Sequence, residues 1–190
     1  VEKEIWKGKD PNSSVTVYKL AGYELHLAEL PDRVAVVGVL KEGKLVYAMR
    51  LEGSAPRLVY GPSLGLDADG DGAPDVLLAW YSGGAHCCYG YQVLNFGPQF
   101  SLGATLDTGS SALELVNAGS NAVFQAADGV LEYWHSSFAQ SIYTTVHLRL
   151  EGDRVLLADA WMRRDAPSAE ALAQYAGEIA EAFVSTEGWL

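Results

Sequence analysis

The sequence has few basic residues and no long run of them. It holds 13 lysines and arginines against 24 aspartates and glutamates, for a net charge of −11, and its longest basic run is the pair Arg163-Arg164. Proteins that bind the nucleic-acid backbone rely on clusters of lysine and arginine. We therefore do not expect a nucleic-acid partner unless a metal ion bridges it to the protein.

Long apolar runs are missing as well. A membrane-spanning helix needs about 18 or more consecutive apolar residues, and no stretch approaches that length, so we expect no membrane span. The chain begins at Val1 without a basic segment followed by an apolar one. We expect that any signal peptide has been removed or is not included. The 190 residues are enough for one domain with a substantial core.

Cysteine is nearly absent, and the two that occur, Cys87 and Cys88, are adjacent. A disulfide between neighbours closes a strained ring, because their Cα atoms lie closer together than in ordinary disulfides. The sequence leaves open a disulfide between them or a reduced pair on opposite faces of a strand. A thiolate metal site is less favoured, because no further cysteines complete one. The pair is a candidate redox site, and a disulfide would indicate an oxidising compartment.

A nine-residue acidic stretch, 67–75, reads Asp-Ala-Asp-Gly-Asp-Gly-Ala-Pro-Asp. Alternate side chains of a tight turn converge on its inside, where carboxylates can surround one hard cation. Another interpretation is a solvated acidic turn, but carboxylates this close repel one another without a counter-ion. Calcium is the expected ion, since magnesium demands near-octahedral geometry and keeps several waters. The expected ligands are the side chains of Asp67, Asp69, Asp71 and Asp75 and the carbonyl of Ala73.

The acidic pattern, followed directly by the apolar run Val76–Trp80, resembles the calcium loop of FG-GAP (integrin-α-like) repeats, in which the loop leads into a β-strand. It is also similar to dockerin and EF-hand loops. An EF-hand has a bidentate glutamate at position 12, where this chain has Leu78, and a helix where this chain is strand-like. The resemblance implies the ion site alone. The pattern occurs once, so neither a propeller nor an adhesion role follows.

Short runs rich in Val, Tyr and Leu, separated by turn residues, predict consecutive antiparallel strands. The expected strands are 15–20, 23–30, 33–41, 44–51, 57–60, 76–81, 91–96, 99–106, 113–116, 122–127, 130–135, 142–150 and 154–158. Glu42-Gly43 and Asp128-Gly129 are predicted two-residue hairpin turns.

Near the end of the chain the apolar spacing changes to that of an amphipathic helix, at about 168–185, which Ser168 or Asp165 can cap. With no internal repeat and no linker, we predict one domain over residues 1–190. Its expected fold is mainly β, a two-sheet antiparallel sandwich with a jelly roll as one option and one C-terminal α-helix.

Two classes of function fit these features. The first is a calcium-braced extracytoplasmic module that binds a small, carbohydrate-like ligand or is purely structural. Its candidate ligand-binding residues, Tyr81, His86 and Tyr89, lie in or beside one glycine-rich loop. The alternative is a metal-dependent phosphodiesterase or nuclease, with His86 or His135 as acid or base beside the loop metal. The sequence does not decide whether the protein is an enzyme. An extracytoplasmic location is expected because weak calcium loops fill where calcium is abundant.

Overall fold

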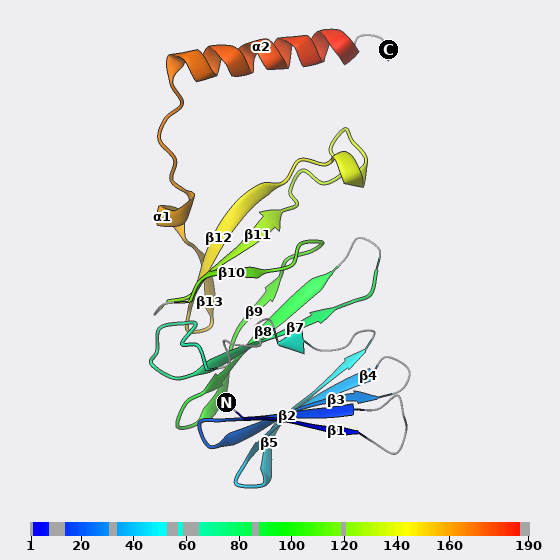
Figure 1. Ribbon diagram of the computed structural model, residues 1–190, viewed down its shortest axis with the longest axis vertical. Helices are drawn as coiled ribbons and strands as arrows, with labels where there is room; N and C mark the ends of the chain where they lie inside the picture. The colour runs from blue at the N-terminus through cyan, green and yellow to red at the C-terminus, as the bar shows by residue number, and fades with distance from the viewer. Residues whose placement is uncertain are drawn as a thin grey trace. The chain divides into compact units, whose positions relative to one another are not determined.

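The computed structural model describes residues 2–7, 14–30, 34–52, 57–58, 65–84, 88–118 and 121–186 (Figure 1). The chain divides into two compact units, Val1–Asp159 and Ala160–Leu190. The first unit contains every strand in the described residues, and the second contains the long C-terminal helix. The single domain expected from the sequence over residues 1–190 stays a prediction.

The described strands form three antiparallel sheets. The first sheet consists of β1 (Glu2–Lys7), β2 (Ser14–Leu20), β3 (Tyr23–Leu30), β4 (Val34–Lys41) and β5 (Lys44–Glu52). The second consists of β6 (Arg57–Leu58), β7 (Asp75–Tyr81), β8 (Tyr89–Phe96) and β9 (Phe100–Asp107). The third consists of β10 (Glu114–Asn117), β11 (Val123–Asp128), β12 (Thr144–Glu151) and β13 (Arg154–Leu157). Neighbouring strands are consecutive in each sheet.

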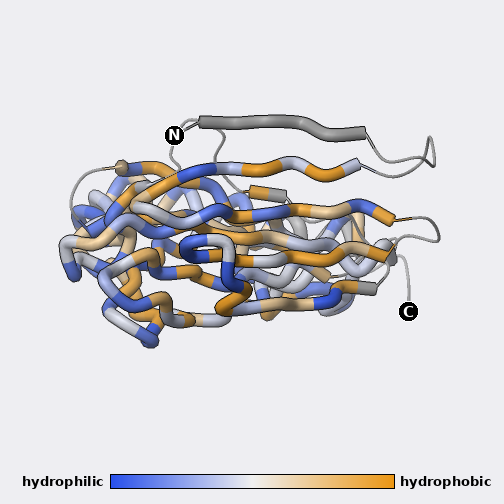
Figure 2. Tube along the Cα trace, turned by 90° about the horizontal axis from the view of Figure 1, so that it is seen from below, coloured by the Kyte–Doolittle hydropathy of each residue, from blue (hydrophilic) through white to orange (hydrophobic). Residues whose placement is uncertain are grey.

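The second sheet lies between two apolar cores. Val76 and Leu78 of β7 pack with first-sheet residues such as Leu25 in one core. Their neighbours in the sequence, Leu77 and Ala79, pack with third-sheet residues in the other core. Successive side chains of a strand point to opposite faces, so β7 is buried on both sides. Hydrophobic and hydrophilic residues alternate along many other strands (Figure 2).

The mainly β class, the antiparallel pairing and the C-terminal helix are confirmed. The number of sheets was wrong, because the strands form three sheets where two were expected. The jelly-roll option was also wrong, since a jelly roll places strands distant in sequence side by side. The predicted hairpin at Glu42-Gly43 is confirmed, with φ values of 51° and 74° that match a two-residue turn of type I′.

The strand expected at 130–135 was wrong, and so was the hairpin at Asp128-Gly129. The chain forms turns after Asp128, and β11 pairs with β12 only from Thr144 onwards. Tyr133 and His135 have φ values of 58° and 51°, which strand geometry does not allow. The N–H of Glu132 donates to the carbonyl of Gly129 at 2.9 Å, which closes a turn in place of the ladder.

The C-terminal unit contains helix α2, Ala169–Thr186, close to the predicted bounds; the short helix α1, Asp159–Met162, begins at the boundary between the units. Ser168 caps α2, because its Oγ accepts the N–H of Ala171 at 3.1 Å. Leu172 and Ile179 are exposed, and no described residue of this unit covers them. No helix in the described residues is long and apolar enough to cross a membrane.

Candidate metal centre

The acidic loop is closed at its base and leads directly into β7. Leu66 and Asp75 form an antiparallel bridge, in which the N–H of Asp75 donates to the carbonyl of Leu66 at 2.6 Å. Inside the loop, Ala68 is buried in the core shared by the second and third sheets. The loop therefore starts and ends at one point, and a buried side chain anchors it between these sheets.

Backbone N–H groups of the loop turn inward onto its own carboxylates. Asp67 accepts from Gly70 at 2.8 Å and Gly72 at 3.1 Å, Asp69 accepts from Asp71 at 3.1 Å, and Asp71 accepts from Ala73 at 2.7 Å. Gly70 and Gly72 have φ values of 84° and 85°, a conformation that glycine adopts without strain. These bonds wind the loop so that alternate aspartates converge.

Three carboxylates meet at the centre of the loop. One oxygen each of Asp67, Asp69 and Asp71 lies within 4.8 Å of the others. Asp69 is buried, and burial raises the pKa of its carboxyl group, with the charges of Asp71 and Asp67 adding to the rise. Among the described residues, no other group of three or more metal-ligating side chains comes this close together.

Asp75, the fourth predicted side-chain ligand, is not among the three carboxylates that come together, and it is 2% exposed. Its Oδ2 accepts the N–H of Ala68 at 2.9 Å, while its Oδ1 is buried without a hydrogen-bond partner. The pKa of Asp75 is raised to about 7, chiefly by burial, with the charge of Asp69 contributing to the rise. A buried carboxylate oxygen without a hydrogen-bond partner is costly, and either a proton or a cation can remove that cost. A hard cation fits this site, because the side-chain ligands that the loop offers are all carboxylate oxygens.

Asn95 holds the loop from outside and was missed in the sequence. It lies opposite Asp75 in the β7–β8 register and is 6% exposed. Its Nδ2 donates to Asp71 Oδ2 at 2.7 Å, and its Oδ1 accepts the N–H of Gly97 at 2.9 Å. Asn95 lies 24 residues beyond Asp71, so only the strand register brings the two together.

The other candidates lie apart from the loop or outside the described residues. The rings of Tyr81 and Tyr89 pack with their centroids 4.6 Å apart on adjacent strands. His135 lies in the turn region before β12, its ring 5.1 Å from that of Trp134. Cys88 is disulfide-bonded. His86 and Cys87 fall outside the described residues, so the pairing of Cys87 with Cys88 stays a prediction.

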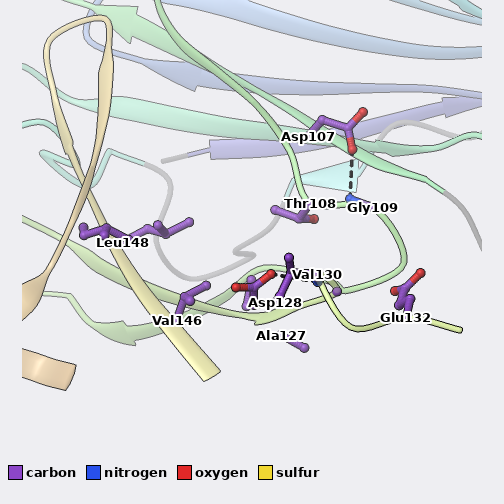
Figure 3. Close-up of a pocket in the computed structure, with 12 residues that line it drawn as sticks. Asp107, Thr108, Gly109, Ala127, Asp128, Val130, Glu132, Val146 and Leu148 are labelled. Carbon is purple, nitrogen blue, oxygen red and sulfur yellow. Dashed lines mark hydrogen bonds between the residues drawn. The ribbon is translucent and has the colours of Figure 1, made fainter. Parts of the chain in front are cut away.

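Described residues of the first unit line at least two cavities. One, of about 370 Å³, adjoins the metal loop and is lined by Lys41, residues 71–74 and residues 96–98, among others. Another, of about 510 Å³, is lined by Asp107, Asp128 and Glu132 and by apolar residues such as Val146 of β12 (Figure 3). Neither cavity includes a histidine among its described lining residues.

Comparison with family models, curated proteins and solved structures found no match for the chain. The similarity of the loop to FG-GAP and dockerin loops therefore stays a resemblance. The function must be inferred from the residues and their geometry.

Proposed function

We propose that the protein binds one calcium ion in loop 67–75 and that the ion braces an extracytoplasmic ligand-binding module. The observation that carries this proposal is the buried Oδ1 of Asp75, which has no hydrogen-bond partner. The other oxygen of the same carboxyl group, Oδ2, accepts the N–H of Ala68. In the sequence, Ala68 lies between Asp67 and Asp69, two of the three clustered aspartates. A bound cation would compensate this charge and the cluster at once.

Calcium is favoured over magnesium by the type and number of the ligands. The loop offers four carboxylates and the carbonyl of Ala73, all of them oxygen. Calcium takes about six to eight oxygens in a flexible arrangement, whereas magnesium keeps several waters in a strict octahedron. The loop is wound by its own backbone N–H groups, and calcium tolerates the irregular arrangement of ligands that such a loop would offer.

The ion would brace the place where three sheets meet. Ala68 belongs to the core shared with the third sheet, and Asp71 is bonded to Asn95 of the second. Just after β8, Gly97 accepts from Tyr23 Oη of the first sheet at 3.0 Å. Calcium in the loop would therefore restrain the second sheet together with both of its neighbours.

The disulfide at Cys88 supports a location outside the cytoplasm, because disulfides persist in oxidising compartments. Abundant extracellular calcium would fill even a weak site. No described histidine lines the cavity beside the loop, and the ring of His135 lies beside that of Trp134, while His86 lies outside the described residues. A metal-dependent phosphodiesterase is kept as the alternative to the module with a carbohydrate-like ligand that we favour.

Calorimetric titration of EDTA-treated protein with calcium tests the proposal. We expect one site in the wild type and none in Asp71→Ala. The control is Asp153→Ala, which changes an exposed aspartate in the β12–β13 turn and should bind calcium normally. Absence of both binding heat and thermal stabilisation by calcium in the wild type would refute the calcium site. An equal loss of calcium binding in both variants would mean that the overall negative charge of the protein, and not the loop, attracts the ion.

A further inference from the structure

The cavity beside the metal loop is walled by two sheets. Lys41, at the end of β4, lines a cavity of about 370 Å³ together with Asp71 and Ala73 of the loop. Gly97 and Pro98, which follow β8, complete the wall. This volume lies at the small end of ligand pockets, which span about 300 to 1,000 Å³. It suits a ligand about the size of one sugar ring.

Lys41 is held in place on this wall. Its Nζ donates to the carbonyl of Pro98 at 2.7 Å and to Tyr23 Oη at 3.1 Å. The ammonium also lies 4.6 Å from the centre of the Tyr23 ring, within the range of a cation–π contact. Because a lysine ammonium carries three N–H donors, one donor is left for a ligand.

A continuous set of hydrogen bonds joins Lys41 to the metal loop. Lys41 donates to Tyr23, and Tyr23 donates to the carbonyl of Gly97. The N–H of Gly97 donates to Asn95, which in turn donates to Asp71. The ammonium and the metal loop are thus fixed relative to one another, which lowers the entropic cost of binding one ligand group between them.

We propose that this cavity binds a sugar acid, a uronate, whose carboxylate is shared between the loop calcium ion and Lys41. This inference rests on the proposed calcium site. The loop supplies five oxygen ligands, whereas calcium takes about six to eight, so one or more positions remain. Two of the five proposed ligating residues, Asp71 and Ala73, line the cavity, which places ligand and ion side by side.

A uronate fits this setting better than a neutral sugar. Its carboxylate and ring oxygen are hard ligands of the kind that calcium prefers, and the carboxylate accepts a charge-assisted hydrogen bond from the ammonium. Pro74 and Pro98 line the cavity and offer apolar surface to the ring carbons. Without calcium, the carboxylate of Asp71 repels an anionic ligand. Binding should therefore require calcium.

Nuclear magnetic resonance of the ¹⁵N-labelled, calcium-saturated full chain tests the inference, with D-galacturonate as the probe and free calcium held constant. We expect saturable shifts at the amides of Gly72, Ala73 and Gly97, no shifts in EDTA and none with D-galactose. Lys41→Gln should weaken binding by about tenfold or more, and Lys41→Arg should weaken it less. Lys44→Gln is the matched control, because Lys44 pairs with Lys41 in the β4–β5 register but does not line the cavity.

The outcomes separate this inference from the calcium site. Calcium binding without galacturonate shifts refutes the uronate site and leaves the calcium site intact. Shifts outside the cavity, or equal effects of Lys41→Gln and Lys44→Gln, also refute it. Stronger binding of inorganic phosphate than of galacturonate at the same amides would overturn the choice of a uronate and favour a phosphate ligand. Failure of the calcium titration itself refutes both proposals.

Discussion

Replacing Asp75 with asparagine should make the calcium-free protein more stable while removing calcium binding. The substitution keeps the shape of the side chain and an oxygen for the N–H of Ala68, but it removes the buried charge. The pKa of Asp75 is raised from an ordinary 3.8 to about 7, chiefly by burial. One pKa unit corresponds to about 1.4 kcal/mol, so ionising Asp75 in the folded protein costs on the order of 4 kcal/mol.

The sign of the pH dependence follows from proton binding. Between about pH 4 and pH 7 the folded protein holds a proton on Asp75 that the unfolded chain releases, so stability falls as the pH rises. This fall should be present in wild type in EDTA and absent from Asp75→Asn. Saturating calcium should also abolish it, because the ion then compensates the carboxylate in place of the proton.

Urea unfolding in EDTA, followed by tryptophan fluorescence at about pH 5 and about pH 8, measures this effect. We expect Asp75→Asn to exceed wild type by up to a few kcal/mol at the higher pH and to differ little at the lower one. Asp153→Asn, which changes an exposed aspartate, should follow the wild type at both. An Asp75→Asn variant that is less stable than wild type at high pH, or that still binds calcium with wild-type affinity, would refute the reasoning.

Three further substitutions test the supports of the loop and of the C-terminal helix. Asn95→Ala should lower calcium affinity by roughly tenfold or more, because Asp71 loses the donor that orients it; unchanged affinity by calorimetry would contradict this. Gly70→Ala should cost about 1–3 kcal/mol of stability, since φ is 84° and a Cβ would lie 2.3 Å from Asn121 Oδ1. In the control Gly43→Ala nothing lies within 4 Å of the new Cβ, so equal losses in urea unfolding would count against the contact. Ser168→Ala should destabilise α2 by about 1 kcal/mol through loss of its cap, which circular dichroism during thermal unfolding would detect.

The strands were largely predictable from the sequence, but their grouping into sheets was not. Alternation and apolar content identify a strand and its buried face. They do not say that Val76 faces one core and Leu77 another, as the structure shows. The error at 130–135 has a different cause. Tyr133 and His135 adopt positive φ, which is uncommon for residues other than glycine, so no sequence signal indicated turns there.

The candidate site also contains residues that the sequence pattern identified and residues that it could not identify. The spacing of the aspartates identified the loop because its ligands are neighbours in sequence. Asn95 and Lys41 lie outside that pattern, and the β7–β8 register and the packing of the first sheet against the second bring them to the loop. The two residues differ in what they do there. Both polar atoms of the Asn95 side chain are hydrogen-bonded within the protein, so its role is to hold the loop in place. Lys41 lines the cavity and uses two of its three N–H donors within the protein. Any ligand specificity at this site therefore depends more on Lys41 than on the aspartates that revealed it.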